Sequence, residues 1–283
     1  MDHIKPSQQL VLEALTKCKF LTTGHMMDLG IKSDRANLNR ELKAMRLWPK
    51  PPIAHINFGS HPSEGKLESV HYLTEYGERL LIEGIELEKK DIKRPVGKSS
   101  LFFKDYNHRR NTIDIHIALL KEQQAGTGEI VFFDTYFDQE GNNRRDASAR
   151  SKTKIDLEDG SHLIADAVTL WRGESGSKLF AIEMYNGKDT SRVEKQLYQH
   201  LVALSEGILA ENVSRDHKHN TGYRVLCVFE FIPQLQVAWQ RLLANPDYED
   251  AKGYFLAKPL EFLKKQPFPE GWLDLDGNEV SLW

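Results

Sequence analysis

The sequence predicts an α/β protein of two domains, on the strength of three observations. Its 283 residues are enough for two domains with separate cores. Residues 1–98 contain helical patterns followed by one pair of strand-like runs, whereas residues 99–283 alternate helices with strands, which favours a mixed central sheet. The segment 87–100 is charged, contains Pro95 and Gly97 and lacks periodicity, so we place the boundary between domains 1–98 and 99–283 within it.

The composition is that of an ordinary globular protein, with 40% hydrophobic and 28% charged residues. A net charge of −3 excludes a globally basic protein, so any surface for nucleic acid must be local. Cys18 and Cys227 lie far apart in the sequence, which excludes a disulfide framework and favours a reducing, cytoplasmic setting. We expect no membrane contact, because no apolar run reaches the length of a span and the N-terminus lacks a signal segment.

The N-terminal domain begins with three helical patterns. We expect the first helix to be capped by Ser7, the second by Thr22 or Thr23, and the third by Ser33. The third helix, residues 34–47, has apolar residues at helical spacing at Leu38, Leu42 and Met45. The remainder of the domain consists of two strand-like runs, 53–58 and 69–74, joined by the loop 59–66, and a closing helix, 75–87.

Three helices followed by a β-hairpin are the plan of a winged helix-turn-helix domain, in which the third helix enters the major groove of DNA. Residues 31–50 contain six Lys or Arg and two acids, a local excess of four positive charges. We interpret the polar face of the third helix as a DNA-binding surface, although a solvated helix face or a protein–protein contact would show the same pattern. Its residues are Arg35, Asn37, Asn39, Arg40, Lys43 and Arg46, of which Asn37, Asn39 and Arg40 are suited to reading base edges.

The C-terminal domain carries its candidate chemistry in a predicted hairpin. Two apolar runs, 163–171 and 178–185, flank a turn rich in Gly and Ser. Each run contains one carboxylate, Asp166 or Glu183, where an apolar residue would pack better. Antiparallel pairing would place the two side by side, so we predict that they bind Mg²⁺ or Mn²⁺ for chemistry on a phosphodiester.

A helix with a basic face, bearing Lys188, Arg192 and Lys195, follows this hairpin. A lysine beside the two carboxylates would stabilise the charge that develops on a phosphate or would orient the attacking water. The alternative is purely structural. Asp166 would then be a polar residue at a strand end, and Glu183 the ion-pair partner of Lys195 or Arg192.

Short motifs in this region resemble the PD-(D/E)xK nuclease-like superfamily. They are ADAV, LFAIEMYNGKDTS and EKQLYQH, all between residues 165 and 200. More narrowly, the chain is similar to the replication-relaxation family and MobC-like mobilisation relaxases. In those proteins a winged helix precedes a His-containing helix, a "DA" strand, a Glu strand and a Lys-x-x-Tyr helix. HYLTEYGERLL resembles the end of their winged helix and NHRRNTIDIHIALL their His-containing helix.

The resemblance implies a restriction-endonuclease-like mixed-sheet domain and a metal-dependent DNA-nicking relaxase. Such an enzyme cleaves one strand of plasmid or conjugative-element DNA at a transfer origin. Its partners would be double-stranded DNA, nicked single-stranded DNA and other mobilisation or relaxosome proteins. The oligomeric state stays open, and a dimer is one of the alternatives. The residues carried over are Asp166 and Glu183 as metal ligands, Lys195 as the catalytic lysine with Tyr198 one turn on, and His108 and Asp114 as supporting residues.

The chain departs from the superfamily at one position. The usual lysine follows two residues after the Glu, where this sequence has Tyr185, so the lysine role falls to Lys195 or Lys188. Tyr185 is a further supporting residue of the predicted site. Tyr185 and Tyr198 could also serve as a tyrosine nucleophile, but tyrosines at such positions are also ordinary packing residues. We favour metal-activated water as the nucleophile, with Tyr198 as an orienting group.

Two other functions remain open from the sequence. The first is a non-catalytic winged-helix DNA-binding regulator or replication accessory protein with a degenerate nuclease fold. The second is a restriction-like endonuclease that cuts both strands as a dimer.

Overall fold

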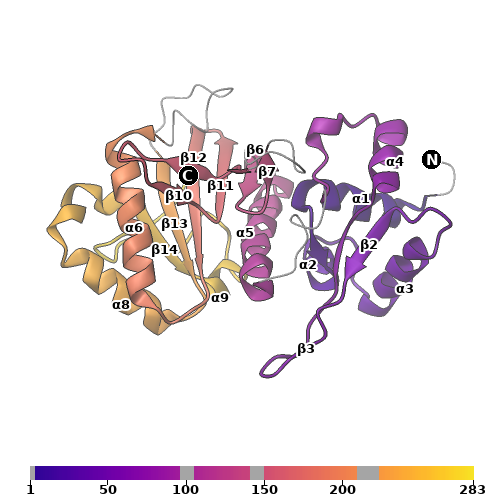
Figure 1. The fold of residues 1–283 in the computed structure, drawn as a ribbon, viewed down its shortest axis with the longest axis horizontal. Helices are drawn as coiled ribbons and strands as arrows, with labels where there is room; N and C mark the ends of the chain where they lie inside the picture. Colours follow the sequence, from indigo (N-terminus) through magenta and orange to yellow (C-terminus); the bar gives the residue numbers. More distant parts are fainter. Residues whose placement is uncertain (1–3, 96–104, 141–149, 209–222) are drawn as a thin grey trace. The chain divides into compact units, whose positions relative to one another are not determined.

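A computed structural model describes residues 4–95, 105–140, 150–208 and 223–283. The chain divides into two compact units, Met1–Tyr106 and Asn107–Trp283 (Figure 1). The domain boundary expected between residues 98 and 99 lies outside the described residues. Both units mix helices with strands, and the second contains a large mixed sheet, so the expected α/β class is confirmed.

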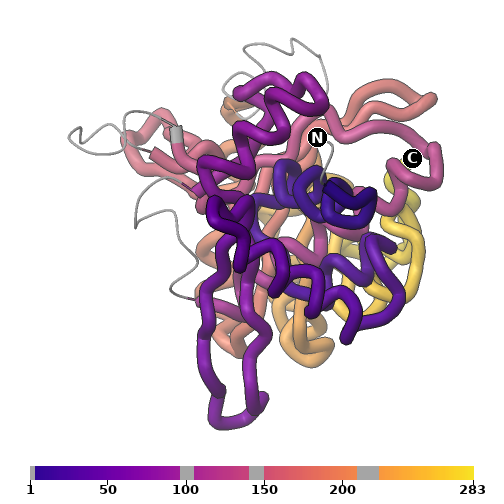
Figure 2. The backbone as a smooth tube through the Cα atoms, turned by 90° about the vertical axis from the view of Figure 1, so that its right-hand side faces the viewer, coloured from indigo at the N-terminus to yellow at the C-terminus, as the bar shows by residue number. Residues whose placement is uncertain are grey.

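The N-terminal unit packs helices against a small antiparallel sheet. The strand order is β1 (Leu21–Thr22), β5 (Val70–Leu73), β2 (Ile53–Ile56). Between β2 and β5 the chain forms a second hairpin, β3 (Ser60–His61) and β4 (Gly65–Lys66), which projects from the unit (Figures 1 and 2). The helices are α1 (Pro6–Cys18), α2 (Thr23–Asp28), α3 (Arg35–Arg46) and α4 (Glu75–Ile85), followed by the 3₁₀ turn η1 (Lys89–Asp91).

The caps of these helices differ in part from those expected. Helix α1 begins at Pro6, whose fixed φ suits the first helical position, so the expected cap at Ser7 is wrong. Thr22 caps α2 as expected. Asp34, not Ser33, caps α3, and its carboxylate accepts a backbone N–H bond from the first turn. The apolar stripe predicted on α3 is confirmed, since its three members are fully buried.

The C-terminal unit is built on a seven-stranded mixed sheet. The pairs β12–β13 and β13–β14 are parallel and the other pairs are antiparallel, which confirms the expected mixed sheet. The order is β16 (Glu279–Val280), β15 (Trp272–Leu273), β14 (Phe255–Pro259), β13 (Tyr223–Phe229), β12 (Gly176–Tyr185), β11 (Ala167–Gly173), β6 (Gly128–Thr135).

Helices cover both faces of this sheet (Figure 1). Helices α6 (Thr190–Ser205) and α8 (Ile232–Leu243) pack on one face with Ala181 of β12, whereas α5 (Tyr106–Gln124) and α9 (Leu260–Leu263) pack on the other with Ile182. Successive residues of β12 therefore enter different cores, which explains its almost unbroken apolar run. The described residues also form η3 (Pro246–Tyr254) and two short strand pairs, β7 (Gln139–Glu140) with β8 (Arg150–Ser151) and β9 (Lys154–Asp156) with β10 (His162–Ile164).

Strands β11 and β12 form the predicted antiparallel hairpin, from the pair Ala167–Ile182 to the pair Gly173–Gly176. Gly176 has φ +98°, a conformation that favours glycine. The first expected run is divided, however, because β10 ends before β11 begins and pairs with β9 instead. Asp166 therefore lies between two strands rather than inside one.

Candidate functional site

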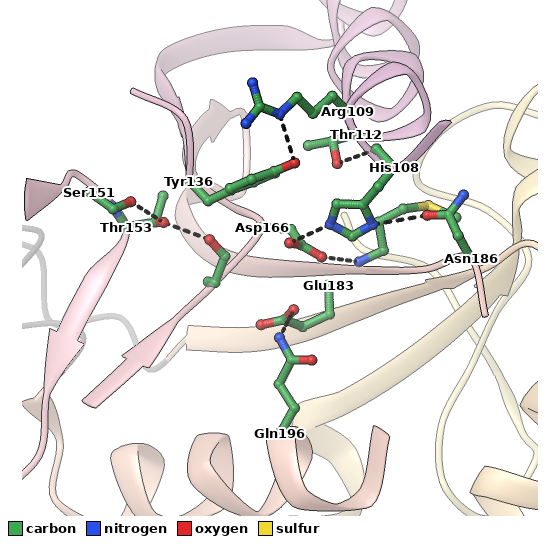
Figure 3. A network of polar contacts seen from close by, with 12 residues as sticks. His108, Arg109, Thr112, Tyr136, Ser151, Thr153, Asp166, Glu183, Asn186 and Gln196 are labelled. Atoms are coloured by element: carbon green, nitrogen blue, oxygen red, sulfur yellow. Dashed lines mark hydrogen bonds and ion pairs between the residues drawn. The ribbon is translucent and has the colours of Figure 1, made fainter. Parts of the chain in front are cut away.

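The two predicted carboxylates meet at the edge of the sheet where β11 begins and β12 ends (Figure 3). Extending the β11–β12 register by one step places Asp166 opposite Glu183. Asp166 Oδ2 accepts a hydrogen bond from the backbone N–H of Met184 at 2.8 Å, which holds the segment before β11 against β12. The exposed fraction is 8% for Asp166 and 0% for Glu183. The hairpin thus brings two acids together in a nearly dry environment.

His108, in the first turn of α5, bridges Asp166 and Asn186 (Figure 3). Its Nε2 lies 2.8 Å from Asp166 Oδ1 and its Nδ1 lies 3.0 Å from Asn186 Oδ1. The Asn186 amide nitrogen donates to Glu230 at 3.2 Å, so the amide oxygen faces His108 and accepts a hydrogen bond. Both ring nitrogens therefore act as donors, which favours the imidazolium.

The pKa of His108 agrees with this bonding pattern. Burial lowers the pKa, but the charge of Asp166 and the hydrogen bonds to Asp166 and Asn186 outweigh burial, and the net pKa is raised above its ordinary value. The Asp166 carboxylate and the His108 imidazolium thus form an ion pair that stabilises both charges at this edge of the sheet.

Two side chains of α6 hold the other carboxyl group. Gln196 donates to Oε2 of Glu183, and Nε2 of His200 lies 2.6 Å from Oε1. A spacing of four residues places Gln196 and His200 on the same face of the helix. Burial lowers the pKa of His200 to about 3, so this histidine is neutral.

Burial also raises the pKa of Glu183 well above its ordinary value. The charge of Asp166 and a hydrogen bond with that carboxylate raise it further. Of the two acids, Glu183 is therefore the one whose proton the folded protein favours.

The donor set fits one mode of divalent metal binding. Within the described ranges no group of three or more His, Cys, Asp or Glu side chains could hold a metal ion. Mg²⁺, however, is usually held by one or two carboxylates together with water and substrate phosphates. Each oxygen of Asp166 and Glu183 has one hydrogen-bonding partner, and each would keep a lone pair for a metal ion once Glu183 has lost its proton. The residues thus fit an ion completed by substrate and not an all-protein cage.

The predicted lysines lie elsewhere. Lys195 is exposed on α6, and the neighbouring Gln196 makes the contact with Glu183. Lys188 is exposed, with its Nζ 5.8 Å from the centre of the Phe231 ring. Among the described contacts, neither lysine bonds to Asp166 or Glu183.

The two tyrosines occupy different environments. Tyr185 is buried in the core against Phe229, with ring centres 4.8 Å apart. Burial, the charge of Glu183 and other nearby groups raise the pKa of Tyr185 well above its ordinary value, so its hydroxyl is a poor nucleophile. Tyr198 is 49% exposed on α6. The environment of Tyr185 is therefore that of an ordinary packing residue.

Asp114 lies six residues after His108 in α5 and forms an ion pair with another part of the chain. The distance between Asp114 Oδ2 and Lys264 Nζ in this ion pair is 2.6 Å. Of the two supporting residues that the resemblance implied, the structure brings His108 to Asp166 and pairs Asp114 with a side chain beyond α9.

The six candidate DNA-binding residues of α3 divide into two groups. Three of them contact other parts of the N-terminal unit: Arg35 pairs with Glu68, Asn39 accepts a hydrogen bond from Thr23 at 2.9 Å, and Arg46 lies 3.3 Å from the His71 ring nitrogen. The other three, Asn37, Arg40 and Lys43, are exposed, and Arg40 donates to Asn37.

Sequence reasoning missed four residues that hold the site: Asn186, Gln196, His200 and Glu230. Two signals could have found them. Gln196 and His200 are polar residues four apart on a helix that follows a strand with a buried acid. Asn186 and Glu230 each come directly after a buried strand, and β12 and β13 are parallel neighbours whose C-terminal ends share one edge.

Comparison with known proteins finds no matching family model, no similar curated protein and no similar solved structure. The resemblance to the PD-(D/E)xK superfamily therefore rests on the short motifs of residues 165–200. In the described part of the chain, no helix is long and apolar enough to cross a membrane.

Proposed function

We propose that the protein is a metal-dependent DNA-nicking enzyme of the relaxase type, which cleaves one strand of plasmid or conjugative-element DNA at a transfer origin. The observation that carries this proposal is the buried Asp166–Glu183 pair with His108 at one edge of the sheet. Placing two acids side by side in a dry site costs stability, so such pairs are more common at functional sites than in structural cores.

The folds of both units support the proposal. The N-terminal order of α1, β1, α2, α3, β2 and β5, with the projecting β3–β4 hairpin, is consistent with a winged helix. The hairpin β11–β12, the crossover helix α6 and the parallel strand β13 are consistent with a restriction-endonuclease-like domain. In this proposal the exposed residues Asn37, Arg40 and Lys43 of α3 contact DNA.

Asp166 and Glu183 would hold Mg²⁺ or Mn²⁺, which when bound neutralises charge at the scissile phosphate and activates a water molecule. The protein's own contribution is orientation. His108 and the Met184 N–H fix the oxygens of Asp166, and Gln196 and His200 fix those of Glu183.

Glu183 must also lose its proton before it can act as an anionic ligand. Neutral His200 does not hold that proton, because its own pKa is about 3, so the proton leaves the pair for solvent. Metal affinity should therefore rise with pH.

A second candidate is a DNA-binding regulator with a degenerate nuclease fold. One observation favours it: all four carboxyl oxygens already have hydrogen-bonding partners in the protein, and in the described contacts no lysine reaches them. A purely structural pair of buried acids would also need a hydrogen-bonding partner for each of its oxygens. The two candidates differ in whether DNA is cut.

The test is nicking of a supercoiled plasmid in the presence of Mg²⁺ or Mn²⁺. We expect the wild-type protein to give open circles, and Asp166→Asn and Glu183→Gln to abolish this product. Glu174→Gln is the matched control, since Glu174 is an exposed acid at the opposite end of the same hairpin. DNA binding without cleavage by the wild-type protein would favour the regulator. A linear product would favour a restriction-like endonuclease, and nicking by both site variants would remove the assignment.

A further inference from the structure

We propose that Arg192 is the cation that contacts the scissile phosphate, in the place where the resemblance implies a lysine. This inference rests on the proposed nuclease function and names a residue that the motifs do not assign. Phosphodiester cleavage builds negative charge on the phosphate, and a fixed cation directed at that charge lowers the barrier. The candidate site contains two acids and needs such a group.

The position of Arg192 on α6 is the first argument. Arg192, Gln196 and His200 are spaced four residues apart, so they form one stripe along the helix. The second and third members of this stripe both contact Glu183. Arg192 therefore lies one turn further toward the N-terminus on the face that meets the carboxylates, whereas Lys195 is rotated by about 100° from Gln196, the middle residue of the stripe, at 3.6 residues per turn.

The availability of Arg192 is the second argument. Its backbone N–H donates to the capping Asp189 carboxylate at 3.2 Å, which fixes the first turn of α6. Its side chain is exposed and, among the described residues, forms no ion pair or hydrogen bond. By contrast, Arg241 near the same helix is already bound to Glu194 and Thr190. An oriented backbone with an unpaired guanidinium is suited to receiving an anion from solvent.

The electrostatic reach of Arg192 is the third argument. Its charge lowers the pKa of Glu183, against the larger effects of burial and of Asp166, and it lowers the pKa of His108, in the same direction as burial and against the larger effect of Asp166. Those two side chains come from different elements, β12 and α5, on either side of Asp166. Arg192 is therefore close enough to the site for its charge to act on both side chains.

Arginine also suits the task chemically. Its planar guanidinium can give two parallel N–H bonds to the non-bridging oxygens of a phosphate. It stays charged at any pH at which the neighbouring acids titrate, so it neither gives nor takes a proton in the reaction. Its role is to hold and stabilise the phosphate, while the carboxylates act on the other side.

The test compares Arg192→Gln, Arg192→Lys and Lys195→Gln in the full chain. We expect Arg192→Gln to lower kcat for plasmid nicking by about 10²–10³-fold with a much smaller change in KM, because the contact is strongest in the transition state. Arg192→Lys should restore part of the rate. Arg172→Gln is the control, because Arg172 is an exposed arginine near the far end of β11.

A second readout does not depend on cleavage. On titration of a single-stranded oligonucleotide of mixed sequence in Ca²⁺, the Arg192 side-chain N–H resonance should shift, and Arg172 should not. If the wild-type protein nicks and Arg192→Gln nicks equally well, or if only Lys195→Gln is impaired, the inference is overturned and the nuclease function stands. A wild-type protein that leaves the plasmid closed with either metal overturns both.

Discussion

The protonation of Glu183 makes a quantitative prediction about stability. Because burial raises its pKa in the folded protein, there is a pH window above the ordinary value of 4.5 in which the folded state holds a proton that the unfolded chain has released. In that window the free energy of unfolding falls as pH rises, by about 1.4 kcal/mol for each pH unit. The loss stops where the pH reaches the folded-state pKa.

Glu183→Gln removes this titration and keeps the shape. The amide oxygen can accept from Gln196, and the amide nitrogen can donate to Nε2 of neutral His200, so both hydrogen bonds persist. The stability of the variant relative to wild type should therefore rise by about 1.4 kcal/mol per pH unit over the same window. The assay is urea unfolding in EDTA, followed by tryptophan fluorescence, from about pH 5 to about pH 7.

The comparison at each pH cancels groups that titrate alike in both proteins, to the extent that they do not couple to residue 183. Glu174→Gln is again the control, since Glu174 is exposed and its variant should follow the wild-type curve. A stability difference between Glu183→Gln and wild type that stays constant over this range would refute the reasoning. It would mean that Glu183 is ionised in the folded protein without metal.

Three further predictions concern other parts of the chain. Gly77→Ala should lower the free energy of unfolding by about 1–3 kcal/mol, because an added Cβ would lie 2.1 Å from the backbone oxygen of Pro52. Thermal unfolding measures the loss, and Gly253→Ala is the control, because no atom lies within 4 Å of the Cβ that it would add. Lys258→Met should lower the free energy of unfolding in urea by about 1–3 kcal/mol, because it leaves two buried carbonyls without their donor. The buried Lys258 Nζ donates to the carbonyls of Pro267 at 3.0 Å and Glu270 at 2.6 Å. A variant as stable as wild type would contradict this. Replacing Arg40 and Lys43 together with Ala should weaken duplex binding and reduce the salt slope by about 1.8, as for two lost phosphate contacts. Fluorescence anisotropy over a salt series measures that slope, with the exposed Arg79→Ala as control, and unchanged affinity would remove α3 from the DNA interface.

The strand pairing of the central hairpin was accessible from the sequence because local chemistry specifies it. Apolar runs on either side of a Gly-containing turn predict antiparallel partners, and the register then places Asp166 opposite Glu183. The division between β10 and β11 was not accessible. It depends on β10 pairing with β9, a contact that the apolar pattern of residues 163–171 does not encode.

The second layer of the site was harder to predict, because it depends on tertiary placement. Which face of α6 meets β12 decides whether Lys195 or Gln196 reaches Glu183, and a one-residue change rotates a side chain by about 100°. Lys195, the lysine suggested by the family pattern, is therefore only one residue away in the sequence from Gln196, the residue that contacts Glu183. The partnership of Asn186 with Glu230 likewise requires knowing that β12 and β13 are parallel neighbours.

The length of the β11–β12 hairpin offers a practical route to following the protein at work. Seven residue pairs separate the carboxylates from the turn at Gly173 and Gly176, a span of roughly 20 Å. A fluorophore attached at the exposed position 174 would thus sit within energy-transfer range of a dye on DNA held at the carboxylates, yet too far away to disturb them. Arrival, cleavage and release of a labelled strand could then be timed separately in a single experiment.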